Sequence, residues 1–379
     1  MEHDIKEWVR PRENTVEALV YGMNECDGVE LDLRLSKDNR LVLHHDSKTE
    51  FGDYPECLTL DELPDYVEPI DDLLERKEFI KRWTEEGGFT CFELKAPHPS
   101  SGKAGGWFNS KERENHMVKM IEELNEIIKS IDFSGSGAVV YSFEPKIITA
   151  SRRVKTKLKF SRLRPHIRSW GNWTSQRVVA TPSFIFNSLP RLMELQRKEK
   201  SPMLPCSLQY LRGIESNLSL GRTVGLEGKK LERLTKYRKG YPIYVWPSKS
   251  NSERKLLDAG LTGLTDDLSP SSVTLESGHA RWTKPATQPL TVDQRKELDR
   301  IPMEQHFEKV CEMKKEVTPW NELSDNERLE FISEWKKKWS WERDIGSLMK
   351  ETSKSSLPWE APRIIGHRGT GKSHRNKSS

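Results

Sequence analysis

Two acidic residues lie two positions apart in an apolar run near the start of the chain. Glu30 and Asp32 alternate with Val29 and Leu31, so in a β-strand both carboxylates point to the same face. Two buried carboxylates repel each other and lose their hydration unless a cation neutralises them. Oxygen ligands of this kind suit a hard divalent ion, Ca²⁺ or Mg²⁺. Taken alone, the pair also fits an ordinary strand with a polar outer face.

A third carboxylate lies near the end of another apolar run. Glu93 belongs to the run 89–94, and Lys95 follows two positions later on the same face. Three carboxylates at the ends of two strands are typical of a metal site, because a barrel core consists mainly of Val, Ile and Leu. We therefore expect one divalent cation, bound by Glu30, Asp32 and Glu93. Lys95 would contact a substrate phosphate, although a lysine at a strand end is also common at a surface.

Two segments that carry histidine could supply acid and base. His45 follows the apolar run 41–44, and His367 follows a second apolar run close to the C-terminus. The ordinary pKa of histidine lies near neutrality, which suits proton transfer. Arg368 comes next, and its guanidinium fork suits a phosphate. The glycines at 366 and 369 would let the backbone approach a ligand closely.

Short apolar runs alternate with longer amphipathic segments along the chain, a pattern typical of parallel β/α proteins. The run 41–45 lies so close to its predecessor that we expect a return strand paired with it. The other runs number eight only if the last one is included, and they predict an eight-stranded (β/α) barrel. The expected strands are 28–35, 41–45, 89–95, 138–143, 158–163, 204–210, 242–246, 263–265 and 363–367.

The order of these motifs resembles the glycerophosphodiester phosphodiesterase family. In that family a His-Arg-Gly strand comes first, whereas here it comes last. The resemblance implies a TIM barrel of the phospholipase C-like phosphodiesterase type, circularly permuted, with an extra helical segment at 291–352. The chain departs from the family pattern at Trp246-Pro247-Ser248. The resemblance is carried by Glu13-Asn14-Thr15, Glu30-Leu31-Asp32, His45-Asp46, Glu93-Leu94-Lys95, Ser142-Phe143, Tyr244-Val245-Trp246, Thr265-Asp266 and His367-Arg368-Gly369.

The family resemblance implies hydrolysis of glycerophosphodiesters to glycerol 3-phosphate and an alcohol. It assigns acid/base catalysis to His367 and His45, and it selects His45 rather than His44, which strand alternation places on the opposite face. It assigns the phosphate to Arg368 and Lys95. Attack by the substrate's own hydroxyl and attack by water are both compatible with these residues.

Two further residues receive roles from the resemblance. Trp246 would line the pocket for the glycerol or the leaving group, although a core or rim aromatic fits equally well. Glu13, at a helix start where a carboxylate suits the helix dipole, would orient a catalytic group. The alternative functions are a lysophospholipase D-like phosphodiesterase, which would need an apolar docking surface, and a catalytically silent scaffold. The tryptophan-rich stretch 331–341 is the candidate for such a surface.

We expect three sections along the chain. Residues 1–270 would hold barrel strands two to eight with their helices, and residues 359–379 the first strand with a polar tail. Residues 271–358 would form a linker and helices, of which one replaces the last barrel helix and one is an appendage. Ser324 and Glu327 form a capping box at the start of the second helix. The segment 291–352 is also the candidate contact for homo-oligomers.

Composition narrows the class of protein. The 379 residues are 32% charged and 34% hydrophobic, with a net charge of +4 from 62 basic and 58 acidic residues, which does not favour a nucleic-acid partner. The five cysteines include no Cys-x-x-Cys pair, which argues against a disulfide framework and a zinc site. No apolar run reaches about 18 residues, and the N-terminus lacks a signal core. We therefore expect a cytoplasmic protein without a membrane span.

Overall fold

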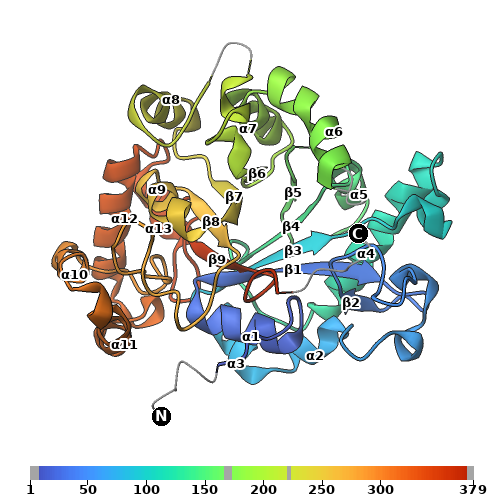
Figure 1. Ribbon diagram of the computed structural model, residues 1–379, viewed down its shortest axis with the longest axis horizontal. Helices are drawn as coiled ribbons and strands as arrows, with labels where there is room; N and C mark the ends of the chain where they lie inside the picture. Colours follow the sequence, from blue (N-terminus) through green and yellow to red (C-terminus); the bar gives the residue numbers. More distant parts are fainter. Residues whose placement is uncertain (1–7, 166–172, 220–222, 374–379) are drawn as a thin grey trace.

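The computed structural model describes residues 8–165, 173–219 and 223–373. Parallel strands form a nearly closed barrel surrounded by helices (Figure 1). The barrel order is β5-β4-β3-β1-β9-β8-β7-β6, and a single bridge between Arg164 and Cys206 joins the sides of β5 and β6. The strands are β1 Gly28–Leu35, β2 Leu41–Leu43, β3 Phe89–Leu94, β4 Ala138–Ser142, β5 Phe160–Arg162, β6 Leu204–Ser207, β7 Ile243–Ser248, β8 Thr262–Thr265 and β9 Ile364–His367.

The last strand of the sequence lies inside the barrel wall. Strand β9, red in Figure 1, lies between β1 and β8. It pairs in parallel with both neighbours, so that His367 lies opposite Glu30 and Gly366 opposite Thr265. Ile364 is fully buried. The predicted eight-stranded barrel is therefore confirmed, and β2 pairs antiparallel with β1 outside the barrel order.

Helices surround the barrel. Thr15 caps α1 by accepting a hydrogen bond from the amide of Ala18, which satisfies one of the free amides of the first turn. The helices before β8 are α1 Val16–Glu25, α2 Ile70–Leu74, α3 Lys77–Thr84, α4 Ser110–Ile127, α5 Ile147–Ser151, α6 Trp173–Phe186, α7 Leu189–Lys198, α8 Gly228–Arg238 and α9 Ser250–Asp258.

Apolar and aromatic side chains fill the lower barrel interior. Phe89, Tyr141, Tyr244 and Ile365 belong to one buried cluster, and the rings of Phe89 and Tyr244 lie 5.6 Å apart. The interior is therefore a packed core and not a pore. Polar side chains of the same strands then occur toward the carboxyl ends, which is where they can meet a substrate.

Four helices follow β8 and pack on the outside of the barrel: α10 Val292–Leu298, α11 His306–Glu316, α12 Asp325–Trp339 and α13 Ile345–Glu351. Trp320, Trp339 and Trp341 are buried in one cluster. The indole of Trp339 donates a hydrogen bond to the carbonyl of Asp258, at the end of α9 (3.0 Å). The tryptophans of this segment thus attach it to the barrel. No helix among the described residues is long and apolar enough to cross a membrane.

Candidate active site

Three carboxylates meet at the carboxyl ends of β1 and β3. Asp32 lies opposite Glu93 in the parallel register of these strands, and alternation along β1 puts Glu30 on the same face. Each of the three side chains offers an oxygen within 4.8 Å of the others, and all three are buried. Burial and repulsion from Asp32 raise the pKa of Glu30 to about 8.

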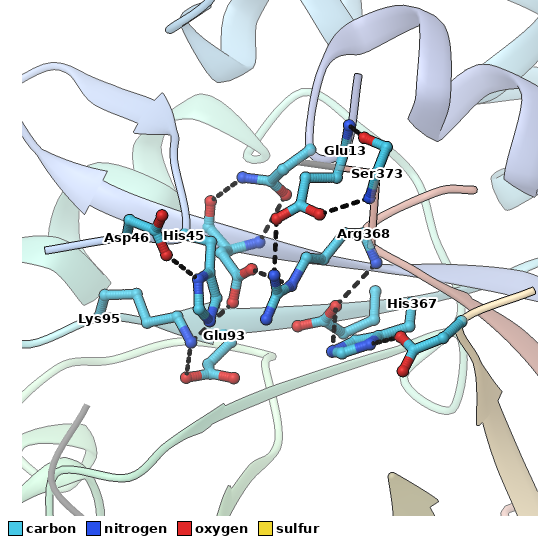
Figure 2. A network of polar contacts seen from close by, with 12 residues as sticks. Glu13, His45, Asp46, Glu93, Lys95, His367, Arg368 and Ser373 are labelled. Atoms are coloured by element: carbon cyan, nitrogen blue, oxygen red, sulfur yellow. Dashed lines mark hydrogen bonds and ion pairs between the residues drawn. The ribbon is translucent and has the colours of Figure 1, made fainter. Parts of the chain in front are cut away.

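Two cations lie against these carboxylates. The ammonium of Lys95 lies 2.9 Å from Asp32 Oδ1 and hydrogen-bonds Glu93 Oε1, and Arg368 Nε lies 3.3 Å from Asp32 Oδ2. Burial opposes ionisation of Asp32, but Lys95, His45 and Arg368 outweigh it and lower the pKa of this carboxyl. The two residues expected to bind phosphate therefore lie at the site, where they also neutralise the acidic cluster (Figure 2).

His367 is held between two carboxylates. Its Nδ1 lies 2.5 Å from Asp266 Oδ1, and its Nε2 lies 3.7 Å from Glu30 Oε2. A proton on Nδ1 can be donated to Asp266, which directs Nε2 toward the cluster. Burial alone would lower the pKa of His367, but the carboxylates of Asp266 and Glu30 outweigh it and raise that pKa.

His45 approaches from the loop after β2. Its Nδ1 lies 2.7 Å from Asp46 Oδ1, so Nε2 is again the nitrogen left for a substrate. Burial and the positive charges of Arg368 and Lys95 lower the pKa of His45 well below its usual value. His44, the competing histidine, is buried, and its Nε2 contacts the carbonyl of Lys48 instead (3.1 Å). Figure 2 shows His45 and His367 with the carboxylates and cations between them.

The segment before α1 supports the site from the other end of the chain. Glu13 Oε1 accepts a hydrogen bond from Arg368 Nη1 (2.7 Å), and its Oε2 accepts one from the amide of Ser373 (2.7 Å). Asn14 accepts a hydrogen bond from the amide of Asp32 and donates one to its carbonyl, both at 2.9 Å. Glu13 lies in the turn before α1 and does not begin the helix as expected. Its carboxylate contacts Arg368, the group that it would orient.

The glycines of the His-Arg-Gly turn serve packing. Gly369 has a φ of +84°, and a Cβ there would lie 2.3 Å from backbone atoms of Ala18 in α1. A Cβ on Gly366 would lie 2.2 Å from the carbonyl oxygen of Gly369. These glycines thus allow a close approach to α1 and within the turn. It lets the amide of Arg368 donate a hydrogen bond to Glu30 Oε2 (3.1 Å).

The ring of Phe143 lies between Trp246 and the charged cluster. Its ring packs edge-on against Phe143 at 5.6 Å, and the ammonium of Lys95 lies 5.9 Å from the centroid of that ring. Trp246 is half-buried and also contacts the barrel core. Both predicted positions, pocket wall and rim aromatic, agree with this placement.

The acidic cluster suits a hard cation. Glu30 Oε1 is buried and has no hydrogen-bond donor among the described residues, whereas Glu30 Oε2 accepts one from a backbone amide. A buried carboxylate oxygen without a donor is costly unless a cation compensates it. The donor set consists only of carboxylate oxygens, which favours Mg²⁺ or Ca²⁺ over a softer metal.

Sequence reasoning missed three residues of this network. Asp266, Asn14 and Ser373 received no role, although Asp266 and Asn14 lie within the quoted motifs. A carboxylate that follows a barrel strand was a usable signal for Asp266. Ser373 lies in the polar tail, where nothing distinguishes it from other serines.

Comparison with protein families identifies the segment that carries most of these residues. Residues 4–181 match the model of the glycerophosphoryl diester phosphodiesterase family. This segment, which is less than half of the chain, is similar to that family of enzymes. The matched segment includes Glu13, Glu30, Asp32, His45 and Glu93. It ends before His367 and Arg368, which the barrel brings to the same site.

Solved structures of the same family show limited likeness. A phosphodiesterase from Oleispira antarctica, in complex with sn-glycerol-3-phosphate, has 14% sequence identity and a TM-score of 0.46, over 68% of this chain and 88% of its own. A glycerophosphodiester phosphodiesterase from Thermotoga maritima has 19% identity and a TM-score of 0.40, over 65% of this chain and 84% of its own. A comparison with curated proteins found no match.

Proposed function

We propose that this chain hydrolyses glycerophosphodiesters to glycerol 3-phosphate and an alcohol. The observation that carries the proposal is the meeting of two distant segments. His367 at the end of β9 and Arg368 directly after it lie against Glu30 and Asp32 of β1, within a barrel whose residues 4–181 match the phosphodiesterase family. Acids, bases and cations suited to a phosphodiester thus converge at the strand ends, where barrel active sites lie.

Glu30, Asp32 and Glu93 would hold one divalent cation, Mg²⁺ or Ca²⁺. When bound, such an ion neutralises phosphate charge and lowers the pKa of a nearby hydroxyl or water. Three carboxylates in mutual reach and the donor-free Oε1 of Glu30 support this assignment.

The chain's own groups would bind the phosphate and move the protons. Arg368 and Lys95 would hold the non-bridging oxygens. One of His45 and His367 would take a proton at Nε2 from the attacking water or substrate hydroxyl, whose oxygen forms the new bond to phosphorus. If the substrate's own hydroxyl attacks, a water would then open the resulting cyclic phosphate to glycerol 3-phosphate. The other would give its Nε2 proton to the oxygen of the departing alcohol as the P–O bond breaks. Asp46 and Asp266, each on Nδ1 of one histidine, would keep both Nε2 atoms directed at the substrate.

We also propose that the chain is a circular permutant of the family barrel, with the strand that comes first in the family at its C-terminus. The position of β9 between β1 and β8 supports this. The hydrogen bond from the amide of Asn14 to the carbonyl of Arg368 (3.0 Å) supports it as well, because it joins the end of the His-Arg-Gly turn to the segment that would follow it.

Release of glycerol 3-phosphate from glycerophosphocholine tests the proposal. We expect activity with Mg²⁺ or Ca²⁺ that disappears after thorough chelation and returns when the ion is restored. We expect Glu30→Gln to lose at least about a hundredfold in kcat, since it removes one charged ligand. Glu304→Gln, an exposed carboxylate on the helical segment, is the matched control and should behave as wild type. Full activity in the presence of chelator would refute the metal assignment.

A further inference from the structure

Large apolar side chains are unusually exposed on loops at one end of the barrel. Phe51 lies between β2 and the turn at Pro55–Cys57 and is 77% exposed. Phe108 lies between β3 and α4 and is 97% exposed, beside the exposed Trp107. Ile214 follows β6 and is 79% exposed. Loops that follow barrel strands lie on the face of the active site, which places Phe108 after β3 and Ile214 after β6 on that face. Phe51 follows β2, outside the barrel order, on a loop that begins at His45 of the site.

Stacked rings hold the first two loops together. The ring of Tyr54 stacks on His98 at 5.5 Å, and His98 meets Trp107 edge-on at 6.0 Å. The ammonium of Lys48 lies 4.9 Å from the centroid of Tyr54. Phe51 and Phe108 are therefore attached to a braced pair of loops.

The same two loops begin at residues of the site. The loop with Phe51 follows His45 and Asp46, and the loop with Phe108 follows Glu93 and Lys95. A surface that Phe51 and Phe108 contact would therefore lie next to the path by which a substrate reaches the active site.

A second group of apolar side chains lies at the loop after β6 and at the end of α6. The α6 helix ends at Phe186, which is exposed. One residue pair fixes this end against the loop after β6: the rings of Phe184 and Tyr210 lie 4.5 Å apart. The hydroxyl of Ser219 also donates a hydrogen bond to the carbonyl of Phe184 (2.9 Å). Phe186 and Ile214 therefore belong to one packed unit beside the entrance.

We infer that this aromatic rim, defined as Phe51, Trp107, Phe108, Phe186 and Ile214, docks the enzyme on a phospholipid surface. The inference rests on the proposed function, because a phospholipid headgroup presents the phosphodiester that the site would cleave. The tryptophan-rich stretch 331–341, the earlier candidate for a docking surface, packs Trp339 and Trp341 inward, so the rim exposes its large apolar side chains more fully.

The form and charge of the rim fit a lipid interface. Its side chains protrude from separate loops, which a fluid interface accommodates more readily than a rigid protein surface does. Aromatic side chains favour the boundary between headgroups and acyl chains. The charges beside them are of both signs, with Glu50 and Asp53 next to Phe51, and Lys103 and Lys111 near Phe108. Mixed charges match zwitterionic choline or ethanolamine headgroups better than an anionic surface.

Co-sedimentation with phosphatidylcholine vesicles tests this inference on the full chain. We expect the wild type to bind, and the double variant Phe51→Ser/Phe108→Ser to bind at least about tenfold more weakly, because two exposed aromatic anchors are lost. The matched control is Val292→Ser/Met303→Ser, two residues of the outer helical segment that are both 58% exposed. This control should bind as wild type does.

Turnover of glycerophosphocholine separates docking from catalysis. Both double variants should retain wild-type turnover of this soluble diester. An inactive wild type would refute the proposed function, and vesicle binding would still be measured independently of it. Absence of wild-type binding to vesicles, or equal binding by the rim variant, would overturn the docking inference. Self-association of the wild type that the rim variant loses, without vesicle binding, would assign the rim to a second copy of the chain and also overturn it.

Discussion

At the scale of single residues, carboxylates of the site contact its histidine and arginine side chains and restrict their positions. Glu13 and Asp32 both contact the guanidinium of Arg368, and Asp266 contacts Nδ1 of His367. Each contact removes rotational freedom from a side chain that would act on the substrate. A residue such as Asp266 is a positioning residue, because it acts through His367.

Replacement of Asp266 by asparagine should separate position from charge. We expect kcat for glycerophosphocholine to fall about a hundredfold with a nearly unchanged KM, because His367 loses the anion that fixes its tautomer. Asp266 contributes to raising the pKa of His367, so its loss lowers that pKa. The limb of the pH–kcat profile that reports His367 should therefore move to lower pH.

Asp267→Asn is the control for this substitution. Asp267 is the next residue, with a side chain that is 47% exposed, and it contacts Arg10 rather than a histidine. It should keep the wild-type kcat and pH profile. An Asp266→Asn profile identical to that of wild type would show that His367 does not depend on this carboxylate.

At the scale of elements, β9 is attached to its neighbours by a buried carboxylate. Asp27, immediately before β1, is fully buried. Its Oδ2 accepts a hydrogen bond from the amide of Ile364 (3.0 Å). Its Oδ1 accepts hydrogen bonds from the amides of Ala286 and Thr287 and from the Thr287 hydroxyl, at 3.1, 2.8 and 2.8 Å. One side chain therefore joins β1, β9 and the linker.

Asp27→Asn should destabilise the protein by about 2 kcal/mol. The side-chain amide of asparagine has one acceptor oxygen and one donor nitrogen, whereas both oxygens of Asp27 accept hydrogen bonds. The nitrogen would therefore face either the amide of Ile364 or the donors of Ala286 and Thr287, and two buried donors would lie against each other. The free energy of unfolding from chemical denaturation measures this. Asp293→Asn, whose side chain is 92% exposed, should change it by less than about 0.5 kcal/mol. Equal stability of the two variants would mean that Asp27 does not hold β9.

At the scale of the whole molecule, residues 11–13 and 370–373, near the two ends of the described chain, meet beside the site. The hydroxyl of Ser373 accepts a hydrogen bond from the amide of Glu13 (2.7 Å), and Thr370 donates one to the carbonyl of Pro11 (3.3 Å). A new connection between the ends would therefore not need to cross the barrel.

A rearranged chain tests this arrangement. We expect a variant that begins at residue 358, joins Ser379 to Met1 and ends at residue 357 to fold and to keep kcat within about tenfold of wild type, because every barrel contact can still form. A chain that ends at residue 360 lacks β9 and should fail to fold, because β1 and β8 both lose the strand with which they pair. Circular dichroism measures whether each variant folds, and release of glycerol 3-phosphate measures its activity. An active chain without β9 would show that His367 is not used.

Local patterns predicted much of this protein. Period-two alternation placed Glu30 and Asp32 on one face of their strand, and the apolar run before His367 predicted β9 as a strand. These properties depend on neighbouring residues only, so they can be recognised without a fold. Pro182 lies within α6, a position that local patterns do not predict, because proline lacks the amide that a helix interior uses.

What the sequence by itself determined are the chemical groups and the strands that carry them. Tertiary structure alone decided their partners: Glu13 and Asp32 with Arg368, Asp266 with His367, and Lys95 with the acidic cluster. The exposed rim around the entrance was likewise visible only in the fold. The physical reason is distance along the chain. Glu13 and Arg368 are 355 positions apart, and Asp266 and His367 are 101 apart. Such contacts depend on closure of the barrel, which no local pattern records.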